Sequence, residues 1–590
     1  MTQTVHIIDV ESGNLQSLAN AIKKIGGYDI KYIHNLKEFN ECDKEISKLL
    51  FPGVGNYGHF VKELHERKLS KPLREYAESG RSLMGICVGL QSLLSSSEES
   101  EGIDGLNFLE LNLRKFDKKD AVFVEKNQLK SIPHIGWNSI TKLTGKNGEE
   151  LSAKESLYGM NLVNKYYFVH SYAAILKNEE DFNTIKKASQ EGWEFAYARY
   201  GSEVFLASVA YKNFFATQFH PEKSGIAGLK ILKSFLEGSK YSQVNESDVQ
   251  THQDDVETTL SGLSRRIIAC LDVRTNDQGD LVVTKGDQYN VRESGSDGKE
   301  EVRNLGKPVE LATRYYLQGA DEVTFLNITS FRNSPIKDLP MLQVLSKAAE
   351  NIFVPLTVGG GIKDLVDPVT GEEYPAVKVA HLYFRSGADK VSIGSDAVTI
   401  AENYYANNKI KTGKTSIESI SSTFGVQAVV ISVDPKRKYL SSPQETSMQT
   451  IEIKDPSNYG PNGEKYCYYQ VTSQGGRKTH ELGALELCLA CQDLGAGEIL
   501  LNSIDNDGSN KGYNLELLSQ IKEQVSIPVI ASSGAGKPEH FQQVFELDCG
   551  IDAALGAGLF HRGDYEVNDV KKYLQSTAKM DVRLDDTVEL

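Results

Sequence analysis

Short apolar runs alternate with amphipathic stretches along the second half of the chain. Eight such runs occupy residues 267–271, 322–326, 352–358, 390–393, 428–433, 498–501, 527–530 and 552–555. Apolar positions recur at helical spacing between them, for example at residues 309–317, 339–349, 482–494 and 515–525. Eight strand-then-helix units in one region predict a (β/α)8 TIM barrel, in which parallel strands close into a ring with helices outside.

The two halves of this region resemble each other. The turn and strand start at residues 319–323 match those at 495–499, and the turn at 387–389 matches the one at 550–552. Asp272, at the end of the first run, corresponds to Asp434 at the end of the fifth. Chance similarity of glycine-rich turns could explain any single match, but the matches together predict a duplicated half-barrel.

The first part of the chain has a looser α/β pattern. Strands are predicted at residues 5–10, 49–51 and 82–86, and helices at 15–24, 73–78 and 88–94. A polar segment with few apolar anchors follows. The chain is therefore predicted to contain an α/β domain over residues 1–237, a linker over 238–262 and the barrel over 263–590.

Composition narrows the classes of function. A hydrophobic content of 40% indicates globular domains, and a net charge of −15 argues against nucleic acid as the main ligand. Seven cysteines without framework spacing suit a reducing compartment. Cys488 and Cys491 have metal-like spacing but lie in an apolar helical stretch, so core packing is favoured over a metal site. With no signal peptide or membrane span visible, we expect a cytoplasmic protein.

The strongest chemical signal joins two motifs that are far apart in the chain. Cys87 lies between Gly85 and Gly89, where a predicted strand turns into a helical pattern. A thiol at such a turn is exposed, and a helix N-terminus favours its thiolate. His220 and Glu222 are two apart, so extended backbone points both to one side. Although a lone cysteine is usually a small buried apolar residue, this combination predicts a nucleophilic triad.

The predicted barrel carries its own candidate site. Asp272 and Asp434 end opposite strands and could divide acid and base roles, although a single aspartate there often only caps its loop. Glycine-rich turns after the third, fourth, seventh and eighth strands predict two phosphate sites. Lys285, in the long loop after the first strand, would add positive charge. The candidate turn residues are Gly360, Gly361, Gly394, Ser395, Ser533, Gly534, Gly556 and Ala557.

These motifs resemble those of class I glutamine amidotransferases. Over nearly the whole chain they resemble the bifunctional imidazole glycerol phosphate synthases of histidine biosynthesis. The segments that carry the resemblance are residues 52–55, 85–91, 133–138, 167–172, 220–225, 266–273 and 503–508.

The resemblance implies roles for residues of the first domain. Cys87 would attack the glutamine amide, His220 would move the proton, and Glu222 would orient His220. Lys223 and Asp389 would bridge the two domains. The glutamine pocket and the oxyanion hole would be formed by Gln91, His170, Ser171 and Tyr172 and by the backbone of Val54, Gly55 and Val88.

In the barrel, the resemblance implies that Asp272 and Asp434 act as acid and base. Ammonia would attack phosphoribulosyl-formimino-AICAR phosphate (PRFAR), giving imidazole glycerol phosphate and AICAR. Asp505 and Gly508 would contribute to the substrate site. Ammonia would enter through a charged gate; stabilising salt bridges are the alternative interpretation of the gate residues. Those residues would be Arg266, Glu310, Lys390 and Glu498.

The implied enzyme needs glutamine and PRFAR, no cofactor, no metal, and no partner beyond its own chain. Ser533 departs from the glycine that bacterial relatives generally have. The segments 406–424 and 441–470 have no expected bacterial counterpart, and surface elaboration is predicted for both. Three alternatives are a glutaminase for another synthase, a barrel isomerase and a non-catalytic descendant. The paired aspartates oppose the first, the Cys87 domain the second, and the presence of Cys87, His220 and Asp272 the third.

Overall fold

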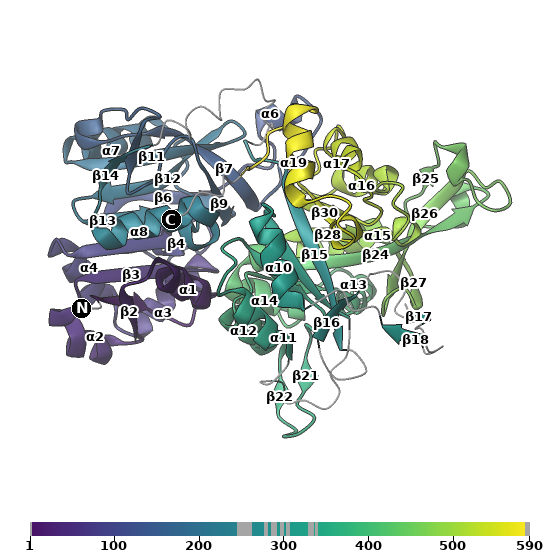
Figure 1. The fold of residues 1–590 in the computed structure, drawn as a ribbon, viewed down its shortest axis with the longest axis horizontal. Helices are drawn as coiled ribbons and strands as arrows, with labels where there is room; N and C mark the ends of the chain where they lie inside the picture. Colours follow the sequence, from purple (N-terminus) through teal and green to yellow (C-terminus); the bar gives the residue numbers. More distant parts are fainter. Residues whose placement is uncertain are drawn as a thin grey trace.

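Two units make up the computed structural model (Figure 1). The structure describes residues 3–244, 262–275, 281–284, 292–294, 300–302, 307–328, 336 and 340–584. The unit drawn in purple to blue is built on a nine-stranded sheet, and the unit drawn in teal to yellow on a closed barrel. Lys285 lies outside the described residues. Within the described ranges, no helix has both the length and the apolar character needed to cross a membrane.

The sheet of the first unit brings distant parts of the chain together. Neighbouring strands are parallel from β2 (Tyr28–Ile33) at one edge of the sheet as far as β13 (Phe214–Thr217). From β13 to β9 (Lys165–His170) at the other edge, neighbouring strands are antiparallel. Because β4 and β13 are neighbours, the residues that follow them meet at one edge. The order is β2 (Tyr28–Ile33), β1 (Gln3–Ile8), β3 (Lys48–Gly53), β4 (Ser82–Cys87), β13 (Phe214–Thr217), β12 (Glu203–Tyr211), β11 (Trp193–Tyr200), β7 (His134–Leu143) and β9 (Lys165–His170).

Helices cover this sheet and begin at capping residues. Asn14 caps α1 (Leu15–Ile25) by accepting a hydrogen bond from Ser17 N, and basic residues in the last turn favour the helix dipole. Other helices are α3 (Tyr57–Glu66), α4 (Ser70–Glu78), α7 (Glu179–Gln190) and α8 (Gly225–Glu237).

The predicted barrel is confirmed, with all eight strands parallel and closed by the β23–β24 pair. One predicted strand is shorter than its apolar run: residues 352–355 are irregular and end at Pro355, which has no N–H to donate to a ladder. The order around the ring is β15 (Arg266–Thr275), β19 (Glu322–Asn327), β20 (Leu356–Gly359), β23 (Lys390–Ile393), β24 (Val429–Leu440), β28 (Glu498–Asn502), β29 (Val529–Ser532) and β30 (Ala553–Gly556).

Helices follow the barrel strands on the outside, as the amphipathic stretches predicted. They are α10 (Pro308–Leu317), α11 (Pro340–Ala348), α12 (Ala376–Arg385), α13 (Ser395–Ala406), α14 (Ser416–Phe424), α15 (Ala484–Leu494), α16 (Leu515–Lys522), α17 (Pro538–Phe545), α18 (Gly558–His561) and α19 (Val567–Ser576). Cys488 and Cys491 are buried in α15, in agreement with core packing.

The two half-barrels extend equivalent strands in the same way. β15 continues past the barrel into a hairpin with β16 (Leu281–Thr284), and β24 does so with β26 (Tyr466–Ser473). In each, the predicted catalytic aspartate pairs with the antiparallel strand: Asp272 with Thr284, and Asp434 with Thr472. Strands one and five of an eight-stranded ring face each other, so the two aspartates occupy opposed positions.

The segments outside the common pattern behave differently from one another. β14 (Tyr241–Gln243), at the start of the predicted linker, pairs with β8 (Glu155–Leu157) of the first unit. In the 441–470 segment, β25 (Ile451–Glu452) extends the projecting hairpin seen at the right of Figure 1. In the 406–424 segment, Ile417 and Ile420 of α14 are fully buried. Surface elaboration is therefore the wrong interpretation for α14.

Candidate active site

Cys87 lies at the end of β4 in a strained turn. Its φ of 53° and ψ of −108° fall in a backbone region that residues other than glycine rarely adopt. Gly89 is required beside it, because a Cβ there would lie 2.0 Å from Phe51 O. The expected helix over 88–94 is wrong beyond its first turn: α5 (Val88–Gln91) ends and the chain enters β5 (Leu94–Ser97). The thiol is 3% exposed, so it is buried rather than exposed as predicted.

His220 and Glu222 meet Cys87 from the neighbouring strand. His220 Nδ1 lies 2.7 Å from Glu222 Oε1, and both side chains are buried. Burial alone would lower the pKa of His220, but the negative charges of Glu222 and of Cys87 raise it well above its ordinary value. The arrangement therefore favours a protonated imidazole beside the sulfur of Cys87.

The predicted oxyanion loop is held in a closed arrangement. Val54 N donates to Ser12 Oγ at 3.2 Å, so this N–H points at Ser12 rather than toward the thiol. Gly55 has a φ of 116°, and a Cβ there would lie 2.9 Å from Thr423 O at the end of α14. The barrel thus contacts the loop directly, and the expected donor role of Val54 is not met in this conformation.

Two of the expected glutamine-pocket residues, His170 and Ser171, differ in their hydrogen bonding. His170 bonds through one ring nitrogen to His134 at 3.0 Å and through the other to Tyr172 O at 2.9 Å. Burial lowers the pKa of His170 to about 3, so it is neutral, and its place in the glutamine pocket stays a prediction. Ser171 Oγ is buried with no hydrogen-bond partner among the described residues, which leaves it available to a ligand.

The seam between the units lies directly behind the triad. His220 N donates to Tyr167 O at 3.0 Å, and the charges of Glu322 and Arg266 in the barrel act on the buried Tyr167 hydroxyl. Lys223 Nζ contacts Asp389 Oδ2 at 2.7 Å, where the sequence placed a bridge between the domains. Asn14 Nδ2 donates to Asp389 Oδ1 at 2.9 Å. Sequence reasoning did not find Asn14.

Four charged side chains form a buried ring at the bottom of the barrel. Arg266, Glu322, Lys390 and Glu498 are each the first residue of a strand. Arg266 contacts the two glutamates at 3.2 and 2.5 Å, and Lys390 contacts them at 2.8 and 2.5 Å. Burial would raise the pKa of Glu498, but Arg266 and Lys390 hold it below its ordinary value.

The expectation that Glu310 belongs to this ring is wrong. It is exposed in the first turn of α10, outside the barrel, and Glu322 takes the expected place. The repeat contained the signal: the segment 319–323 matches 495–499, which aligns Glu322 with Glu498. Glu310 lies on a helix outside the barrel, whereas Glu322 starts a strand and so faces the bottom of the barrel.

The opposite end of the barrel holds the two aspartates. Asp434 Oδ1 accepts a hydrogen bond from Asn502 Nδ2 at 2.7 Å. Burial raises the pKa of Asp434, and hydrogen bonds from Asn502 and Ser432 only partly oppose this. Asn502 is a site residue that the sequence did not reveal, although it ends β28 beside the mouth.

The predicted phosphate turns lie at the same end as the aspartates. Gly360, Gly361 and Gly534 have φ values of 96°, 76° and 96°, and a Cβ at Gly534 would lie 2.2 Å from Gly512 O. Ser533 has a φ of 74° without being glycine.

The remaining candidates form the surrounding loops. Gly394 and Ser395 begin α13, Gly556 ends β30, and Ala557 lies between β30 and α18. Asp505 accepts a hydrogen bond from Arg437 N at 2.8 Å, in the exposed loop that contains Gly508.

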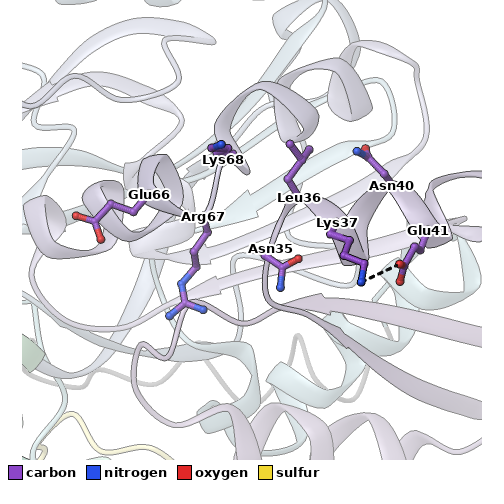
Figure 2. Close-up of a pocket in the computed structure, with 8 residues that line it drawn as sticks. All are labelled: Asn35, Leu36, Lys37, Asn40, Glu41, Glu66, Arg67 and Lys68. Atoms are coloured by element: carbon purple, nitrogen blue, oxygen red, sulfur yellow. Dashed lines mark ion pairs between the residues drawn. The ribbon is translucent and has the colours of Figure 1, made fainter.

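A surface depression of about 640 Å³ lies elsewhere on the first unit (Figure 2). Its charged side chains are largely paired, as Lys37 is with Glu41 at 3.8 Å and Arg67 with Glu63 at 3.0 Å. It contains none of the predicted site residues. Its lining residues are Asn35, Leu36, Lys37, Asn40, Glu41, Glu66, Arg67 and Lys68.

Comparison with known proteins covers both units. The family described as "Glutamine amidotransferase class-I" matches residues 6–238, and "Histidine biosynthesis protein" matches residues 266–566. A protein of Emericella nidulans named imidazole glycerol phosphate synthase hisHF is 53% identical over 574 residues, 97% of each chain. The protein of that name from Schizosaccharomyces pombe is 50% identical over 576 residues, 97% of this chain and 98% of the relative. A relative from Arabidopsis thaliana, named as chloroplastic, is 45% identical over 98% of this chain and 89% of its own length. The chain therefore belongs to the bifunctional imidazole glycerol phosphate synthases, in which a class I glutamine amidotransferase is fused to a histidine-biosynthesis barrel.

Proposed function

We propose that the chain hydrolyses glutamine at Cys87, passes the ammonia into the barrel and uses it to convert PRFAR into imidazole glycerol phosphate and AICAR. The observation that carries this proposal is the placement of two sites on opposite sides of one buried charged ring. The Cys87 triad lies on one side and the Asp272–Asp434 pair on the other.

In the first step, the Cys87 thiolate attacks the amide carbon of glutamine. His220, kept protonated by Glu222, gives its proton to the departing ammonia. Water then releases glutamate from the thioester. Each oxyanion-hole donor contributes roughly 3–4 kcal/mol to such a step. Val54 N–H becomes a donor once it leaves Ser12 Oγ.

Ammonia would travel through the barrel interior as the neutral molecule. Above the charged ring, a cluster of buried and mainly apolar side chains in the barrel leaves little room for competing water. These include Ile268, Val430, Leu500, Ile530 and Leu555. The ring of Arg266, Glu322, Lys390 and Glu498 would act as the gate at the entrance, because its salt bridges close that end.

In the second step, the two aspartates divide the proton transfers. The raised pKa of Asp434 suits it to be the acid that protonates the leaving group, and Asp272 is then the base. The two phosphates of PRFAR would bind the glycine-rich turns after β20 and β29 and the starts of α13 and α18. This places the reacting middle of PRFAR between the aspartates.

Separate sites can be tested with two single variants. Cys87→Ala should abolish glutamine-dependent turnover and leave ammonia-dependent cyclisation at the wild-type rate. Asp272→Asn should stop cyclisation with either nitrogen source. The assay follows AICAR release from PRFAR with glutamine or with ammonium salt. Equal loss of both activities in Cys87→Ala would contradict two sites, and ammonia-dependent turnover in Asp272→Asn would remove Asp272 from the chemistry.

Binding of PRFAR in the barrel is proposed to switch on the glutaminase. The support is the closed oxyanion loop, in which Val54 is held by Ser12 while Gly55 contacts Thr423 of α14. Glutamate release from glutamine should therefore accelerate when PRFAR is added to the Asp272→Asn variant, which cannot consume it. An unchanged rate would rule out this switch.

One chain would suffice for both reactions, since the units contact each other through Lys223 and Asp389. The cytoplasmic location stays a prediction, because the plant relative is named as chloroplastic.

A further inference from the structure

The side chain of Gln218 reaches the sulfur of Cys87 directly. Gln218 follows β13 and is fully buried. Its Nε2 donates to Cys87 Sγ at 3.6 Å. Gln218 belongs neither to the triad nor to the residues expected to line the glutamine pocket, so this contact has no role in the mechanism described above.

The direction of the Gln218 amide is fixed from its far end. Gln218 Oε1 accepts from Gln91 Nε2 at 3.1 Å, and Gln91 Nε2 also donates to Tyr172 O at 2.9 Å. A flipped Gln218 amide would set two NH₂ groups against each other and turn a carbonyl oxygen toward the sulfur. Both ends of the amide therefore favour an N–H that points at the sulfur.

A buried thiolate depends on such donors. Surroundings of low dielectric favour the neutral thiol unless positive charge or hydrogen bonds stabilise the anion. The helix that follows Cys87, α5, has only four residues, so its dipole contributes little. His220 supplies positive charge. The Gln218 amide is the neutral donor that completes the surroundings of the sulfur.

The sequence spacing explains why Gln218 can reach this position. Gln218 and His220 are two apart in the chain, and the φ of −97° and ψ of 101° at His220 are extended. Alternate residues of extended backbone share one face. The amide of Gln218 therefore leaves the chain on the same side as the imidazole, while Glu222 reaches the imidazole from the short 3-10 helix Pro221–Lys223.

We propose that Gln218 is a positioning residue of the glutaminase site, whose amide N–H holds the Cys87 sulfur as a thiolate aligned for attack. Gln91 sets the direction of that N–H and so has a task that precedes any contact with glutamine. The inference rests on the proposed role of Cys87 as the nucleophile.

The test is the pH dependence of Cys87 alkylation in the full chain. Gln218→Met keeps the length and most of the volume of the side chain and removes the donor. Iodoacetamide labelling without glutamine is followed by the mass of the peptide that contains Cys87. The pH at which the labelling rate is half-maximal should rise by about one unit, as expected for loss of one hydrogen bond to a charged group. Turnover of glutamine should fall about tenfold, with KM changed less than about twofold.

Matched variants separate positioning from structure. Gln190→Met, at the exposed end of α7, should leave the labelling profile unchanged. Gln91→Met should move it in the same direction as Gln218→Met but by less. Ammonia-dependent cyclisation at the wild-type rate verifies that each variant is folded.

A wild-type labelling profile in Gln218→Met would overturn the inference, whatever the turnover of that variant. Failure of the underlying proposal is a different result, since it would appear as glutaminase activity that survives in Cys87→Ala.

Discussion

At the scale of single residues, the chemistry of the first unit depends on how charge is stabilised in a buried site. Cys87 and His220 are both shielded from water, which by itself opposes charge on either. Glu222, 2.7 Å from the imidazole, tips the balance by raising the pKa of His220. Because the pKa of His220 lies well above its ordinary value of 6.5, the imidazole stays protonated at neutral pH.

Glu222→Gln should therefore move the alkaline limb of the glutaminase profile to lower pH. The substitution removes the negative charge that raises the pKa of His220, so the imidazole loses its proton earlier as pH rises. Turnover at neutral pH should fall by about a hundredfold or more. The measurement is kcat/KM for glutamine against pH. Glu237→Gln, at the exposed end of α8, is the control, and an alkaline limb unmoved in Glu222→Gln would contradict the assignment.

At the scale of elements, the turns after the barrel strands decide where backbone N–H groups can gather. Gly534 cannot carry a side chain, because Gly512 O lies where its Cβ would be. Ser533 adopts the same left-handed backbone although it has a Cβ. The turn between β29 and α17 therefore stores strain at a place proposed to bind phosphate.

Ser533→Gly should relieve that strain and raise the free energy of unfolding by about 1 kcal/mol. Ser533→Ala is the matched control, since it removes the hydroxyl and keeps the strain. The measurement is chemical denaturation of both variants beside the wild type. If the glycine variant were no more stable than the alanine variant, the left-handed conformation would not be costly here.

At the scale of the whole molecule, the charged ring links stability to the path between the sites. Arg266 and Lys390 are each held by both glutamates, and Thr357 Oγ1 donates to Glu322 Oε1 at 2.6 Å. Removing one charge from such a network leaves a buried cation without its full complement of partners.

Glu322→Gln should lower the free energy of unfolding by about 3–5 kcal/mol. Glu310→Gln, on the exposed face of α10, should change it by less than about 1 kcal/mol. Denaturation of the two variants separates the residue that the structure places in the ring from the one the sequence suggested. Because the ring is proposed to be the gate for ammonia, Glu322→Gln should also reduce the yield of AICAR per glutamine hydrolysed. Measuring AICAR and glutamate together gives this yield. Equal stabilities would mean that the ring is not a coupled network.

Sequence alone determined most of the elements and the main candidate catalytic residues. The alternation of apolar runs gave the eight barrel strands, because burial on both faces makes each strand apolar throughout. The duplication placed Asp272 and Asp434 at equivalent strand ends. The predicted contact of His220 with Glu222 is confirmed, but the predicted extended backbone is wrong, because Glu222 lies in the 3-10 helix Pro221–Lys223. All these are local patterns, which the linear chain carries in full.

Only the tertiary structure decided which distant groups share an environment. Pairing of β4 with β13 put Gln218 against the sulfur of Cys87, and packing of the units set α14 against Gly55. Strand starts, not helix turns, faced the bottom of the barrel, which put Glu322 in the ring and left Glu310 in water. The physical reason is that hydrogen bonds, burial and charge act over a few ångströms in space, whereas these residues are tens to hundreds of positions apart in the chain.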